Sequence, residues 1–133
     1  MSQPLITIEN LQTHFFTDDG VVKAVEDVSL AIPRGKTLGL VGESGCGKSV
    51  TALSVIGLIS SPGRIVGGRI TLSENGSPVV LNELPESRMR QMRGGKIAMI
   101  FQEPMTSLNP VFTIGDQIIE AVRLHRDVGK KDA

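Results

Sequence analysis

The sequence predicts an α/β fold in which an antiparallel β layer at the N-terminus precedes a core of buried parallel strands. Two short runs, the mostly apolar 37–41 and the entirely apolar 97–101, are typical of strands that are covered on both faces. Two stretches closer to the N-terminus, 5–11 and 21–32, alternate between apolar and polar residues, as strands with one buried face do. A glycine-rich loop lies between the first apolar run and a stretch of helical length, and the order strand, loop, helix favours an α/β core.

The N-terminal layer is predicted from two alternating stretches, Leu5 to Leu11 and Val21 to Ile32. Asp18-Asp19-Gly20 between them is a hairpin signal. A second hairpin is predicted around Glu74-Asn75-Gly76-Ser77, with strands at 69–72 and 78–81. These stretches indicate antiparallel pairing between segments that are close in sequence.

Three helices are predicted. The first covers 49–58 and follows the glycine loop, and the second begins at Pro85 and ends at Arg93, before two glycines. The third has Thr113 as its cap, with Asp116 three residues later. Its apolar face is formed by residues at helical spacing, namely Ile114, Ile118, Ala121, Val122 and His125.

Length and composition narrow the class of protein. The chain has 133 residues, enough for one domain or a piece of one, and its 14 basic and 14 acidic residues give zero formal net charge. That balance favours neither nucleic acid nor an anionic membrane as a partner. One cysteine excludes an internal disulfide, and Met1 to Asn10 has no secretory pattern, so we expect a cytosolic chain. The longest nearly apolar stretch, Val50 to Ile59, is about half of the roughly 20 residues that a membrane helix needs.

The segment from Gly42 to Ser49 has the spacing G-x-x-x-x-G-K-S of a phosphate-binding loop. Backbone N–H groups can surround phosphate oxygens only where side chains leave room, which glycine does. The ammonium of Lys48 can reach the terminal phosphates, and the Ser49 hydroxyl can ligate a magnesium ion that bridges them. The helix that follows adds the positive end of its dipole. This context favours a nucleotide site over a simple glycine-rich turn.

Three blocks of sequence resemble a known family, the ATP-binding subunits of ABC transporters, and most closely its oligopeptide, dipeptide and nickel importers. They are Gly42 to Ser49; Arg93 to Pro110, RGGKIAMIFQEPMTSLNP; and Leu11 to Leu30. The resemblance implies a P-loop NTPase core with an N-terminal antiparallel β layer, ending before the signature and Walker B motifs. It further implies that residues 1–111 belong to the ATP-binding core and that 112–133 begin a helical subdomain.

The resemblance also implies roles for single residues, with ATP and Mg²⁺ as cofactors. Gln102 would approach the magnesium ion and the attacking water, so that Lys48 and Gln102 are the expected catalytic residues and Ser49 and Gln102 the expected metal ligands. Phe15 would stack on adenine, with Phe16 as the alternative. The expected nucleotide-binding residues of the loop are Gly42, Glu43, Ser44, Gly45, Cys46, Gly47, Lys48, Ser49 and Val50.

Several family motifs do not occur in these 133 residues. Nothing reads as the signature LSGGQ, as the Walker B aspartate with its catalytic glutamate, or as the switch histidine. The run from Ile97 to Glu103 does not serve as Walker B, because neutral Gln102 would stand at the metal-ligand position. Neither His14 nor His125 lies where the switch histidine would fall. We therefore expect nucleotide binding without turnover from this chain.

The partners that the resemblance implies are membrane permease subunits, which would dock on the region from Gln102 to Pro110. A second ATP-binding subunit would close the site, and an extracytoplasmic solute-binding protein would act indirectly. The expected function is to energise the import of peptides or similar small solutes from the cytoplasmic face of the membrane, as a peripheral subunit.

Other interpretations stay open. A basic run could contact nucleic acid, as in non-transport ABC proteins, but it fits a solvated helix face better; it comprises Arg88, Arg90, Arg93 and Lys96. A GTP-driven switch would need a guanine reader, and Gly129 to Asp132 lacks its Asn or Thr. Cys46 is either a small filler of the loop or a reactive thiol. The chain could also be another P-loop NTPase module, or inactive alone because its sheet is incomplete.

Overall fold

The computed structural model describes residues 4–74, 76–103 and 107–133. It divides the chain into two compact units, Met1–Met89 and Arg90–Ala133, referred to as the first and second units.

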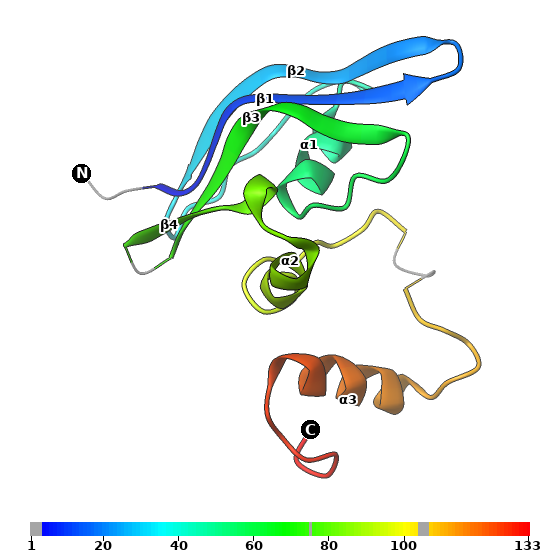
Figure 1. Ribbon diagram of the computed structural model, residues 1–133. Coiled ribbons are helices and arrows are strands. Elements are labelled where there is room, and N and C mark those ends of the chain that lie inside the picture. The colour runs from blue at the N-terminus through cyan, green and yellow to red at the C-terminus, as the bar shows by residue number, and fades with distance from the viewer. Residues whose placement is uncertain (1–3, 75, 104–106) are drawn as a thin grey trace. The chain divides into compact units, whose positions relative to one another are not determined.

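The first unit is built on a four-stranded antiparallel sheet (Figure 1). The strands run in the order β2-β1-β3-β4, and β1 pairs along its length with both β2 and β3. Thr17 pairs with Gly20 at the turn, where the Thr17 hydroxyl donates a 2.8 Å hydrogen bond to the Gly20 carbonyl. Both predicted hairpins are therefore confirmed. Three strands are longer than expected, namely β1 (Pro4–Thr17), β2 (Gly20–Pro33) and β3 (Gly63–Glu74), and β4 (Ser77–Val80) has the expected length.

A row of left-handed residues crosses the three long strands, with φ of +54° at Asp27 in β2, +49° at Asn10 in β1 and +87° at Gly68 in β3. The Asn10 amide donates a 2.6 Å hydrogen bond to Asp27, and its backbone N–H donates to Ser29 Oγ at 2.8 Å. A Cβ on Gly68 would lie 2.5 Å from the Asn10 carbonyl oxygen, so glycine is required there. The pairing register of β1 shifts at this row, called the bulge row below, and such shifts bend and twist a sheet.

Helix α1 (Lys48–Val55) packs against β1, β2 and the short 3₁₀ helix η1 (Leu81–Glu83). It ends three residues before the predicted end at Leu58. Helix α2 (Glu86–Met92) matches the predicted second helix within a residue at each end. The core of the first unit combines sheet residues with apolar side chains from these helices: Ile8, Leu11, Val25, Ile56, Ile70, Leu72, Leu81 and Met89.

The two predicted parallel strands are absent from the described structure, and this prediction is wrong. Residues 37–41 and 97–101 lie outside regular strands, and Val41 and Ile100 are each 95% exposed. A parallel strand needs hydrogen-bonded neighbours at its edges and helices over its faces. The four strands of the described sheet pair only antiparallel with one another, so they offer neither segment a parallel neighbour.

The second unit contains α3 (Ile114–His125), which is capped as predicted. The Thr113 hydroxyl accepts a 3.1 Å hydrogen bond from the Asp116 N–H and donates to the Asp116 carboxylate at 2.7 Å. The predicted apolar residues do lie on one helix, but no other described element covers them. Ile114 and Ile118 are more than half exposed, and the helix buries no residue. None of the described helices is long and apolar enough to cross a membrane.

Candidate phosphate-binding site

The loop from Gly42 to Gly47 leads directly into α1, where Gly47 is the N-terminal cap with a left-handed φ of +91°. A Cβ built on Gly47 would collide with the backbone carbonyl of Ala24 in β2. The Gly47 carbonyl accepts hydrogen bonds from the Thr51 N–H at 2.8 Å and the Thr51 hydroxyl at 3.0 Å. Glycine therefore lets the end of the loop press against the sheet, which fixes where α1 begins.

Lys48 folds back onto this loop. Its ammonium donates to the carbonyls of Gly42 at 2.6 Å and Glu43 at 2.5 Å and approaches Cys46 Sγ at 3.3 Å. All three donors of the ammonium are thereby used within the loop. The positive charge is held beside the positive end of the α1 dipole, a combination that favours an anion.

The other predicted loop residues line the same short segment. Gly42, Glu43, Ser44, Gly45, Cys46 and Ser49 are exposed, whereas Gly47, Lys48 and Val50 are half-buried. A Cβ on Gly42 would lie 2.6 Å from Cys46 Sγ and 3.9 Å from Lys48 Nζ, so a side chain there would fill the cradle. The nine predicted residues thus form one short loop around the Lys48 ammonium.

A magnesium ion would fit the chemistry at Ser49, whose hydroxyl lies in the first turn of α1. No group of three or more His, Cys, Asp or Glu side chains among the described residues could hold a metal ion unaided. Magnesium commonly takes one or two protein oxygens together with phosphate oxygens and water, which this loop allows.

Phe15 and Phe16 point to opposite faces of β1. Phe15 pairs with Gly63 of β3, and a Cβ on Gly63 would lie 2.6 Å from the Phe15 ring, which occupies that space. Phe15 shares its face with Thr13, which contacts α1. Phe16 lies under the guanidinium of Arg64, 4.1 Å from the ring centroid. Only Phe15 is therefore on the side of the sheet that carries α1.

Gln102 lies in the second unit, in an exposed bend after Phe101. The loop and Phe15 belong to the first unit, so Gln102 is separate from them in the division of the chain. Within the predicted docking region from Gln102 to Pro110, residues 104–106 lie outside the described residues.

The sequence analysis did not identify the hydroxyl groups buried between β1 and α1. Thr13, Thr51 and Ser54 are each less than 7% exposed, and the Thr13 and Ser54 hydroxyls are 2.8 Å apart. The available signal was the i, i+3 spacing of two hydroxyl residues within the otherwise apolar stretch from Val50 to Ile59.

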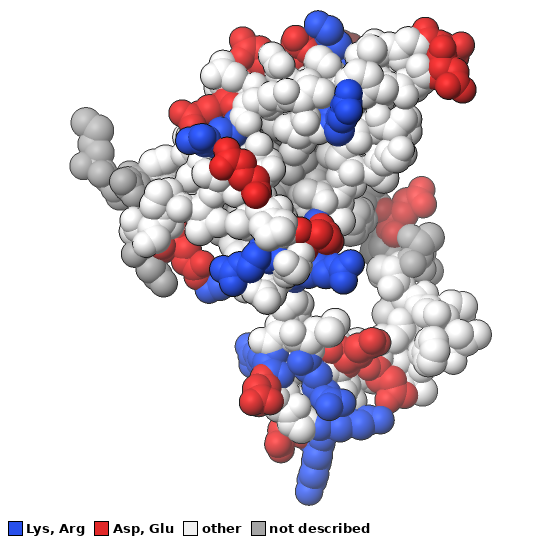
Figure 2. Space-filling view, viewed as in Figure 1, with Lys and Arg blue, Asp and Glu red and all other residues white. Residues whose placement is uncertain are grey.

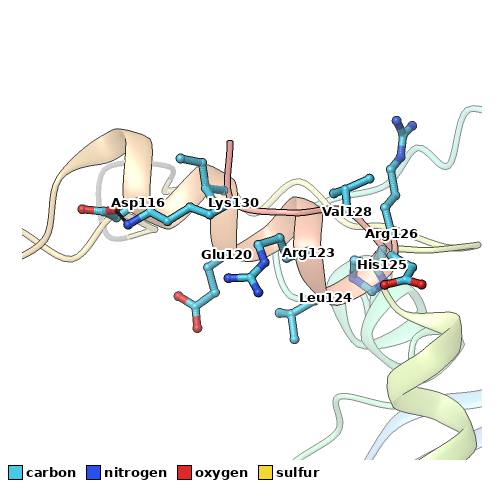
Figure 3. Close-up of a pocket in the computed structure, with 10 residues that line it drawn as sticks. Asp116, Glu120, Arg123, Leu124, His125, Arg126, Val128 and Lys130 are labelled. Carbon is cyan, nitrogen blue, oxygen red and sulfur yellow. Dashed lines mark ion pairs between the residues drawn. The ribbon is translucent and has the colours of Figure 1, made fainter. Parts of the chain in front are cut away.

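A pocket of about 670 Å³ lies in the second unit, along α3 and the chain that follows it (Figure 3). Its walls contain three basic and three acidic side chains, and Lys130 pairs with Asp116 at 3.2 Å. The six are Arg123, Arg126, Lys130, Asp116, Glu120 and Asp127. No residue of the glycine loop lines it. Its charges of both signs balance one another, so this pocket lacks the concentration of positive charge that phosphate binding needs.

Charged groups of both signs are also interspersed on the surface in Figure 2. Hydrogen bonding lowers the pKa of two exposed carboxyls below their ordinary values. The His14 ring, whose Nε2 lies 2.7 Å from Glu26 Oε2, lowers the pKa of Glu26. The Thr113 hydroxyl, and after it Lys130, lowers the pKa of Asp116. Both groups lie outside the loop and stabilise local structure.

Comparison with known proteins adds family evidence. The model of the ABC transporter family matches residues 25–132. A Sinorhizobium fredii protein named "Probable peptide ABC transporter ATP-binding protein" is 46% identical over 97% of this chain and 38% of its own length. The glutathione import ATP-binding protein GsiA of Salmonella typhimurium is 46% identical over 99% of this chain and 22% of its own length. The chain therefore spans about two fifths or less of the length of these relatives.

Two solved structures have a similar fold. They are the dimeric bacterial ABC transporter cassette MJ0796, with a TM-score of 0.77 and 20% identity, and the same cassette in a post-hydrolysis state bound to ADP and Pi, with 0.76 and 19%. Each match covers 93% of this chain and 49% of the solved chain. The predicted fold class is confirmed as a partial ABC-type cassette containing the antiparallel sheet and helices.

Proposed function

Because the chain belongs to the ABC transporter family, we propose that it binds ATP with Mg²⁺ through the loop from Gly42 to Ser49. We further propose that it forms part of an ATP-binding subunit that energises the import of peptides or similar small solutes. The observation that carries nucleotide binding is the Lys48 ammonium, held inside a glycine loop that is pressed against the sheet. The name of the Sinorhizobium fredii relative supports transport of peptides, and that of the Salmonella typhimurium relative supports import.

Each residue of the loop has a role in this proposal. Backbone N–H groups from Gly42 to Val50 would surround the phosphates, and the flexible stem of Lys48 would let its ammonium leave the loop carbonyls for phosphate oxygens. The Ser49 hydroxyl would ligate Mg²⁺, which neutralises and orients the phosphates when bound. Phe15, on the α1 side of the sheet, would stack on the adenine.

Gln102 is proposed to approach the magnesium ion and the attacking water and to sense the transport subunit. The region from Gln102 to Pro110 would dock permease subunits, a second ATP-binding subunit would complete the site, and a solute-binding protein would act indirectly. The chain would then work at the cytoplasmic face of the membrane. We place residues 1–111 in the ATP-binding core and 112–133 at the start of a helical subdomain.

The test is calorimetry of Mg-ATP binding to the purified chain, with Lys48→Ala as the main variant. We expect the dissociation constant to rise about 100-fold, because hydrogen bonds to charged groups contribute about 1.5–3 kcal/mol each. Lys36→Ala is the matched control, since it removes the same charge from an exposed turn before the loop.

Two results would contradict the proposal. One is equal ATP affinity of Lys48→Ala and the unaltered chain. The other is a strict preference for GTP in competition, which would indicate a guanine reader instead of adenine stacking. Lys48-dependent steady-state hydrolysis would contradict only our expectation of binding without turnover.

A further inference from the structure

We propose that the buried hydroxyls of Thr13 and Ser54, which are hydrogen-bonded to each other, form a hydroxyl chain that positions the phosphate loop relative to the strand bearing Phe15, with the buried Thr51 hydroxyl supporting the first turn of α1. The chain would make recognition of the base and recognition of the phosphates act together. This inference rests on the proposed nucleotide binding and assigns positioning residues to that site.

The location of these hydroxyls is unusual within the molecule. Among the described residues only three polar side chains are buried, and these are the three: Thr13 is 0% exposed, Thr51 6% and Ser54 1%. None of the described buried side-chain polar atoms lacks a hydrogen-bond partner. Buried polar groups therefore gather at one contact, between β1 and the helix that follows the loop.

The direction of the hydrogen bonds follows from the contacts. The Ser54 hydroxyl donates to the Val50 carbonyl at 2.8 Å, and a hydroxyl has one hydrogen to donate. Thr13 therefore donates to Ser54 across 2.8 Å. The chain runs from β1 through Ser54 to the carbonyl of the residue after Ser49.

The Thr51 hydroxyl supports the other end of the same turn. It donates to the carbonyl of Gly47, the residue that is pressed against the Ala24 carbonyl of β2. Thr51 and Ser54 thus bond to backbone carbonyls of Gly47 and Val50 at the start of α1, and Thr13 ties Ser54 to β1. Phe15 lies two residues beyond Thr13, on the same face of the strand.

A hydrogen bond restricts geometry more than an apolar contact does. Valine and alanine could fill this space, but they would leave α1 free to rotate or slide against the sheet. A fully satisfied polar network in a low-dielectric interior rigidifies one arrangement. The arrangement fixed here is the one between Phe15 and the turn that carries Lys48 and Ser49.

The test compares two ligands, Mg-ATP and Mg-tripolyphosphate, the second of which lacks a base. For Thr13→Val we expect the dissociation constant of Mg-ATP to rise about five- to tenfold, the loss of one hydrogen bond. For Mg-tripolyphosphate we expect a change below about twofold, because the loop itself stays intact. Ser54→Ala should give the same pattern, and Thr13→Ser, which keeps the hydroxyl, should restore ATP affinity.

Thr7→Val is the matched control, since it makes the same substitution in β1 at a half-buried position outside the hydroxyl chain. An equal loss for both ligands would overturn the inference, because the hydroxyls would then only support the loop. Unchanged ATP affinity in folded Thr13→Val or Ser54→Ala would also overturn it. Failure of the unaltered chain to bind either ligand would instead contradict the proposed function.

Discussion

The two units differ in how far their apolar residues are covered. The first unit buries eight apolar side chains between its sheet and its helices, whereas no described residue from 90 to 133 is buried. The strands of the first unit find partners nearby: β1 pairs with β2 across a tight turn, and β3 pairs with β4 in the same way. An apolar pattern therefore produces a buried core only where the strands and helices that cover it are present, as they are in the first unit.

Helix α3 shows what can form without burial. Its cap and its local hydrogen bonds require only neighbouring residues, whereas residues 97–101 would need distant strands on each side. The helix is therefore formed while the strand is not.

A matched pair of leucines tests the difference in burial directly. Leu11 is fully buried in the sheet of the first unit, and Leu124 on α3 is 74% exposed. We expect Leu11→Ala to lower the free energy of unfolding by about 2–5 kcal/mol and Leu124→Ala to change it by less than about 0.5 kcal/mol. Urea denaturation followed by circular dichroism measures both, and equal costs would remove the distinction between the units.

Two glycines with positive φ provide a second comparison. A Cβ on Gly47 would meet the Ala24 backbone, whereas a Cβ on Gly94 would meet the end of the His125 side chain, which can move. We expect Gly47→Ala to destabilise its unit by about 3 kcal/mol and Gly94→Ala by about 1 kcal/mol, the cost of φ alone. Thermal unfolding of both variants tests this, and the reverse order would show that the loop is not fixed against β2.

The cap of α3 gives a smaller effect. Thr113→Ala should cost about 1 kcal/mol of helix stability, because the Asp116 N–H loses its acceptor. Since α3 buries no residue, the loss should appear as faster amide exchange in the helix and leave the sheet of the first unit unchanged. Thr113→Ser keeps the hydroxyl and serves as the control. Slower exchange at β1 amides in Thr113→Ala, or no change in α3, would contradict the prediction.

The pH dependence of the same cap is the smallest effect. In the folded chain the pKa of Asp116 lies below its ordinary value of 3.8. The main cause is the hydrogen bond that the Asp116 carboxylate accepts from Thr113, and the second is the nearby Lys130 ammonium. A lowered folded pKa means that the stabilisation is complete above pH 3.8 and is lost as the pH falls through the folded pKa. The protection factors of the α3 amides, in which the intrinsic pH dependence of exchange is removed, should fall over that acidic range, and Asp116→Asn should abolish the fall. A fall that persists in Asp116→Asn would assign it to another group.

Sequence patterns predicted the elements that depend on neighbours along the chain. The hairpin turn at Asp18 to Gly20 and the Thr113 cap are examples. The runs at 37–41 and 97–101 have the apolar pattern of buried strands but do not form them, because an apolar run does not reveal whether a partner strand exists. Alternation showed that Phe15 and Phe16 face opposite sides, but only the position of α1 identifies Phe15 as the one on its side. The Thr13 contact with Ser54 spans 41 residues, a separation that no local pattern reports.

The bulge row has a consequence for how this strand tolerates insertion and deletion. The row fixes the pairing of β1 at Asn10, so the number of residues from there to the strand end decides which side chains face α1. Losing one residue in that interval would exchange the two faces. Phe16 would then take the place of Phe15, and an aromatic ring would still face the helix. The adjacent phenylalanines thus keep an aromatic ring at this position when β1 loses one residue, whereas a gain of one residue would bring His14 there.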